Sequence, residues 1–137
     1  VIEEKMTGSF WQQHDVEAKI RRILRDVPDG IPEHHFGRPF LSAYQLAIEF
    51  ALRYPQDAAA LGLPVGGEGT GQRNSLSQYL AGQLSRLISL GQLPDIEGGF
   101  LSNWHLADIT FNNQGLPLHS SLTTSGFPLS MFRLRQS

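Results

Sequence analysis

Residues 66–73 form a glycine-rich segment whose composition suits the binding of an anion. Four of the six residues from 66 to 71 are glycine, and such loops can hold a phosphate with backbone N–H groups where they lead into a helix. A nucleotide-hydrolysing phosphate loop also needs a lysine and then a hydroxyl after its last glycine, but Gln72 and Arg73 stand there. The sequence therefore predicts a connecting loop or, alternatively, a weak anion-binding loop through Gly67, Gly69 and Gly71.

Two of the five histidines, His34 and His35, are neighbours in a segment that also contains prolines. Adjacent residues of an extended segment point to opposite sides, so these rings are not expected to bind one metal ion together. The H-E-x-x-H motif is absent, and there is no cysteine to supply a thiolate. We therefore predict neither a metal site nor a cofactor.

The sequence lacks the local motifs of nucleophilic catalysis. It contains no G-x-S-x-G motif and no cysteine nucleophile, and acidic residues are sparse after Asp57. We interpret the chain as non-catalytic. A small enzyme with a site near the Gly66–Gly71 loop or His34/His35 stays open as the second alternative.

Segment 76–90 is predicted to be a helix with one small, polar face, which suits an approach to DNA. Amide and guanidinium groups on this face, at Gln78 and Arg86, match the edges of adenine and guanine. We therefore predict a module that binds double-stranded DNA in a regulatory or target-recognition role. Alternatively, another helix or a second subunit packs on the small residues. The predicted DNA contacts are Arg73, Ser77, Gln78, Ser85, Arg86, Arg133 and Arg135, with Arg73 and Ser77 on phosphates and Arg133 and Arg135 flanking the site.

Residues 109–132 carry no formal charge. The core of a protein interface is depleted of charge in this way, but so is a segment that wraps a core. The first alternative to DNA binding is therefore a protein-interaction or dimerisation module that uses residues 109–132 to bind a partner or a second copy.

The elements that must position these residues follow from capping patterns and periodicity. Serine followed three residues later by glutamine precedes three apolar-periodic stretches, which is typical of helix starts. Alternating apolar residues near 107–111 and 129–135 predict strands. The resulting fold class is α+β, a three-helix core followed by a C-terminal β-hairpin or small antiparallel sheet in winged-helix-like order. The predicted helices span 10–27, 42–54 and 76–90, with a short helical turn at 56–62.

Length and composition indicate one domain. The chain has 137 residues, 18% charged residues and a net charge of -2, so DNA binding would depend on a few placed arginines rather than on a basic surface. No apolar run is long enough to span a membrane, and no membrane partner is expected. The absence of cysteine fits a cytoplasmic location. Residues 1–137 are expected to form the domain, with 1–8 either a disordered N-terminal arm or residues added to the natural chain.

Overall fold

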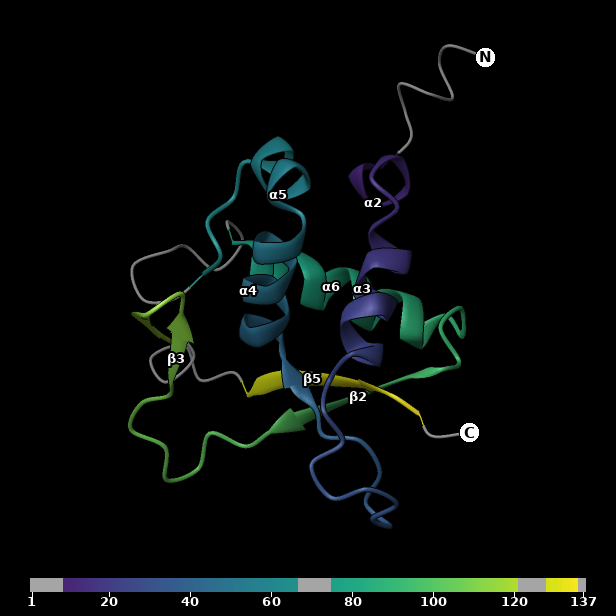
Figure 1. Ribbon diagram of the computed structural model, residues 1–137, viewed down its shortest axis with the longest axis vertical. Helices are drawn as coiled ribbons and strands as arrows, with labels where there is room; N and C mark the ends of the chain where they lie inside the picture. The colour runs from purple at the N-terminus through teal and green to yellow at the C-terminus, as the bar shows by residue number, and fades with distance from the viewer. Residues whose placement is uncertain (1–8, 67–74, 121–127, 136–137) are drawn as a thin grey trace.

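The protein, seen in a computed structural model, combines helices with small antiparallel sheets (Figure 1). The structure describes residues 9–66, 75–120 and 128–135. Among the described residues, the helices precede the strands at 96–134, and one two-residue strand stands earlier, between two of the helices. This confirms the predicted α+β class, with helices followed by a small antiparallel sheet. The helices are α2 (Phe10–Gln13), α3 (Val16–Arg25), α4 (Ala43–Arg53), α5 (Pro55–Leu61) and α6 (Leu76–Ser89). The strands are β1 (Leu41–Ser42), β2 (Ile96–Leu101), β3 (Thr110–Asn113), β4 (Leu116–His119) and β5 (Leu129–Leu134).

Three helices begin at the serines that the sequence singled out. The side chains of Ser9, Ser42 and Ser75 each accept a hydrogen bond from the backbone N–H three residues further on. At α4 the bond is reciprocal, because the side chain of Gln45 accepts the N–H of Ser42 at 2.7 Å and completes a capping box. Helix α6 is followed by Gly91 at φ 74°, the left-handed backbone that glycine adopts most easily.

The single helix predicted over 10–27 is in fact broken into α2 and α3. Asp15 adopts a left-handed backbone conformation with φ 49° between them. The reason is the burial of both Trp11 and Val16. In one continuous helix, these two residues would point about 140° apart at 100° per residue, wider than the roughly 100° apolar stripe of an amphipathic surface helix. The break turns both side chains inward.

The hydrophobic core lies where α4 packs between α3 and α6. Ile20 of α3, Phe50 of α4 and Leu80 of α6 are completely buried. In Figure 1, α6 passes behind α3 and α4, and the sheet closes the core at one end. From the sheet, Ile96 and Phe132 complete the core.

The main sheet has the order β1-β5-β2, with both pairings antiparallel. Leu41 of β1 lies opposite Phe132 of β5, and Gly98 of β2 lies opposite the same phenylalanine from the other side. Strand β2 was not predicted, because its two central glycines are poor strand formers. The second sheet is the β3–β4 hairpin, whose Phe111 stacks on Tyr44 of α4 with ring centroids 5.1 Å apart.

Candidate nucleic-acid interface

Helix α6 has one buried face and one exposed face. Leu80 and Leu84 point into the core and are fully buried. On the opposite side, Gly82 and Ser85 are exposed, and apart from the neighbouring backbone of α6 itself, no atom of the described residues lies within 4 Å of a Cβ added at Gly82. The middle of this face is therefore open to close approach by another molecule. The exposed face consists of Gly82, Ser85, Arg86 and Ser89, with half-buried Gln78 toward the N-terminal end.

Arg86 supplies the positive charge of this face. Its guanidinium donates to the side-chain oxygen of Gln83 at 3.1 Å, and it forms no ion pair with a carboxylate in the described part of the chain. Since the partner is a neutral amide, the charge of Arg86 stays available to an acidic ligand.

The first backbone N–H groups of α6 are used within the protein. The N–H groups of Leu76 and Ser77 donate to the carbonyl oxygens of Pro64 and Val65 at 2.7 and 2.9 Å. The N–H of Gln78 donates to its cap, Ser75. These three donors are therefore occupied within the protein. Gly67, Gly69, Gly71 and Arg73 lie outside the described residues.

Ser77 cannot act as the predicted phosphate contact, because it is only 3% exposed. Its hydroxyl is within hydrogen-bonding distance of the Ser75 hydroxyl, at 3.1 Å. Gly66 lies directly against it, and a Cβ at position 66 would come within 2.6 Å of the Ser77 oxygen. Helical periodicity puts Ser77 close to the exposed face of α6, but the segment that leads into the helix covers the Ser77 side chain.

Arg133 of β5 and Arg135, which follows β5, both contact groups within the protein. Arg133 donates to the carbonyl oxygens of Phe36 and Arg38 at 2.6 and 3.0 Å and pairs with Glu97. Its side chain is 19% exposed, so the predicted role of Arg133 beside DNA does not fit this structure. Arg135 shares Glu97 and donates to the carbonyl of Pro94, but its side chain is 55% exposed.

Most other cations are paired with carboxylates. Arg21 binds Asp95 at 2.8 Å, and this hydrogen bond raises the pKa of the arginine. Lys19 and Arg38 face Asp57 and Asp29 in the same way. In the described ranges, the arginines without an ion pair are Arg22, Arg25 and Arg86.

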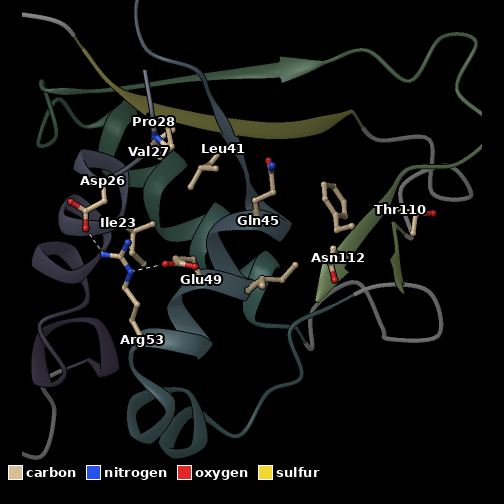
Figure 2. A pocket seen from close by; sticks show the side chains of 12 residues that line it. Ile23, Asp26, Val27, Pro28, Leu41, Gln45, Glu49, Arg53, Thr110 and Asn112 are labelled. Carbon is tan, nitrogen blue, oxygen red and sulfur yellow. Dashed lines mark hydrogen bonds and ion pairs between the residues drawn. The ribbon is translucent and has the colours of Figure 1, made fainter. Parts of the chain in front are cut away.

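An open cavity of about 520 Å³ lies between α3, α4 and β3 (Figure 2). At one end, Arg53 pairs with Glu49, one helical turn before it, and also with Asp26 of the segment after α3, each at 2.7 Å. Two carboxylates around one guanidinium leave this end acidic, so the cavity does not suit a phosphate. The contribution of Asp26 had no sequence signal, because it lies 27 residues from Arg53.

His34 and His35 do not point to opposite sides, as was predicted for an extended segment. The rings of His34 and His35 stack with centroids 4.2 Å apart, because the segment turns at Glu33, which has φ 62°. Nevertheless, no group of three or more potential His, Cys, Asp or Glu ligands occurs among the described residues.

Two histidine–aspartate pairs were not found by sequence reasoning. Nδ1 of His14, at the end of α2, lies 2.7 Å from Oδ1 of Asp57 in α5, and this contact links the two helices. Nδ1 of His119 lies 2.9 Å from Asp108, at the base of the β3–β4 hairpin. The partners are 43 and 11 residues apart, so no short motif announces either pair.

The described residues of the uncharged stretch 109–132 are divided between core and surface. Leu129 and Phe132 are buried, whereas Leu116 is 69% exposed. Larger apolar groups are exposed just before this stretch, on β2 and the loop after it, where Phe100 is 70% and Trp104 80% exposed.

Comparison of the chain with protein-family models, curated proteins and solved structures gave no match. Within the described ranges, none of the helices has the length and apolar character needed to cross a membrane.

Proposed function

We propose that the protein is a DNA-binding module of winged-helix-like arrangement and that the exposed face of α6 enters the major groove. The observation that carries the proposal is the division of α6 into a fully packed apolar face and an open face with a glycine at its centre. A recognition helix needs both, because the core must hold it rigidly while bases approach its outer side. The proposal retains the cytoplasmic location that the cysteine-free sequence favours.

The order of the elements also supports this proposal. Helix α4 precedes α6 and packs against it, and the antiparallel strands β2 and β5 follow. In a winged helix, this order places a hairpin beside the recognition helix. Here α5 and the segment after it are inserted between α4 and α6, which makes the connection longer than a simple helix-turn-helix turn.

The proposed contacts are fewer than the sequence suggested. Gln78 and Arg86 keep their roles at base edges, and Ser85 remains a proposed contact on the exposed face. Arg135, just after β5, remains an exposed arginine that is proposed to flank the site. Since each neutralised phosphate contributes about 0.9 to the slope of log affinity against log salt, a module with few cations binds non-specific DNA weakly and with a shallow slope. Affinity for a preferred sequence would then depend on base contacts.

The test is fluorescence anisotropy with labelled random-sequence duplexes at about 50 and about 200 mM salt. Arg86→Ala should reduce binding, whereas Arg22→Ala, which removes the same charge from α3, should change it much less. Gly82→Glu is the sharper variant. Its Cβ meets no described atom within 4 Å, and glutamate favours helix more than glycine does. It should therefore remain folded and lose DNA binding.

Selection from a randomised duplex library, followed by the same titrations, covers the case of a strictly sequence-specific protein. Enrichment of a sequence by the wild type but not by Gly82→Glu supports the proposal. No binding in either experiment, or equal binding by Gly82→Glu and the wild type, overturns it.

A further inference from the structure

Strand β2 presents one edge without a strand partner among the described residues, because β5 occupies the other edge. Proteins usually protect such edges with lysine, proline or a bulge. The sequence of β2, IEGGFL, contains neither lysine nor proline, and all six of its residues pair in continuous register with β5. This edge can therefore accept a further antiparallel strand.

The charge of β2 does not oppose such an addition. Its one charged residue, Glu97, is held by Arg133 at 3.3 Å and by Arg135 at 3.4 Å. Two guanidinium groups thus neutralise the single carboxylate. A second strand of the same composition would meet no uncompensated like charge.

The exposed apolar groups lie at the end of the same strand. Phe100 is 70% and Leu101 42% exposed, and Trp104 follows at 80%. A further strand at this edge would bury part of these exposed rings, and that burial would stabilise the pairing.

We propose that β2 pairs antiparallel with β2 of a second copy around a two-fold axis at Gly99. Residues opposed across such a pair point to the same face of the sheet. This register places Phe100 of each copy opposite Gly98 of the other, and aromatic rings across a strand cover edge glycines well. Glu97 then faces Leu101 of the second copy, whereas a register centred on Glu97 would oppose two carboxylates.

The resulting dimer is two-fold symmetric and joins two three-stranded sheets into one of six strands. A single strand pair with two phenylalanines forms a small interface, below the roughly 1,200 Å² of stable complexes, so the expected dissociation constant lies in the micromolar range. The inference does not rest on DNA binding, since it uses no residue of α6.

The absence of cysteine makes a single-cysteine experiment possible. In Gly99→Cys, the introduced thiols would meet at the axis, where opposed Cα atoms lie about 4.5–5.5 Å apart, within disulfide range. No described atom lies within 4 Å of a Cβ at this position, so the variant should fold. Gly82→Cys, on the exposed face of α6, is the matched control because its site is equally open.

In a glutathione redox buffer, Gly99→Cys should form disulfide-linked dimers at least about tenfold faster than Gly82→Cys, because strand pairing raises the effective concentration of the thiols. Adding Phe100→Lys to Gly99→Cys should reduce the rate to that of the control, with circular dichroism confirming the fold. Wild-type protein should show a concentration-dependent dimer in sedimentation velocity.

Equal cross-linking rates for the two single-cysteine variants would overturn the proposal. So would faster linkage through Gly82→Cys, or a wild-type monomer at about 1 mM, well above the expected dissociation constant. Addition of Arg86→Ala should leave the cross-linking of Gly99→Cys unchanged, which separates this result from any loss of DNA binding.

Discussion

The guanidinium carbon of Arg133 lies 4.2 Å from the centroid of the Phe40 ring, so a residue of the last described strand stacks on the segment that precedes β1. The same guanidinium donates to the carbonyl oxygens of Phe36 and Arg38. Arg133 therefore fastens the segment between α3 and β1 to the sheet through stacking and forked hydrogen bonds together.

Replacement of Arg133 by alanine should lower the free energy of unfolding by about 1–3 kcal/mol, because two backbone carbonyls and Glu97 lose a charged donor. Arg133→Lys should recover little, since an ammonium cannot reproduce the fork. Urea denaturation measures the change, and limited proteolysis should show faster cleavage between residues 28 and 40. The control is Arg135→Ala, whose more exposed side chain should cost less; an equal cost for both variants would contradict this role.

Gly82→Ala should raise the free energy of unfolding by about 1 kcal/mol, since glycine in a helix interior is less favourable than alanine by that amount. The added Cβ meets no described atom within 4 Å. Gly91→Ala should do the opposite, because its φ of 74° strains any residue with a Cβ. Thermal and urea denaturation of both variants test the pair, and a destabilised Gly82→Ala would show that its face is covered.

The ion cluster of Asp57 should make stability depend on pH in the acid range. Hydrogen bonds from Lys19 and then His14 lower the pKa of Asp57. The carboxylate therefore contributes stability that is fully present above its unfolded pKa of about 3.9 and is lost as pH falls through the folded pKa. The difference between wild type and Asp57→Asn in urea midpoint should be largest near neutral pH and shrink at acid pH. A difference that stays constant with pH would argue against this cluster.

Ser42→Ala should cost about 1–2 kcal/mol, since it removes the cap of α4 at a buried position and leaves the N–H of Gln45 without its acceptor. Ser9→Ala should cost less, because α2 has only four residues and lies at the edge of the fold. Chemical denaturation of the two variants compares them. An equal cost would show that neither the burial of Ser42 nor its capping box adds to the cost of losing the cap.

The starts of α2, α4 and α6 could be predicted because their serine caps are local patterns. The exposed face of α6 could also be predicted, since a period of 3.6 residues separates Leu80 and Leu84 from Ser85 and Arg86. Strand β2 could not, because its glycines form a strand only through pairing with β5, more than 25 residues later.

Two of the predicted DNA contacts, Ser77 and Arg133, do not fit the structure for a related reason. Ser77 is covered by Gly66, and Arg133 is held by Phe36, which lies 97 residues away. Periodicity assigns a residue to a face of its own element, but it contains no information about which distant segment covers that face.

The order of the strands has a consequence for how the chain folds. Strand β5 is the last of the described strands in sequence but the middle one in the sheet. Both β1 and β2 pair with β5, so a growing chain that still lacks residues 129–134 cannot form either pairing. Leu41 and Ile96 then have no strand opposite them. The main sheet therefore cannot form until β5 has been synthesised. The helices can form earlier, because their contacts are mostly local.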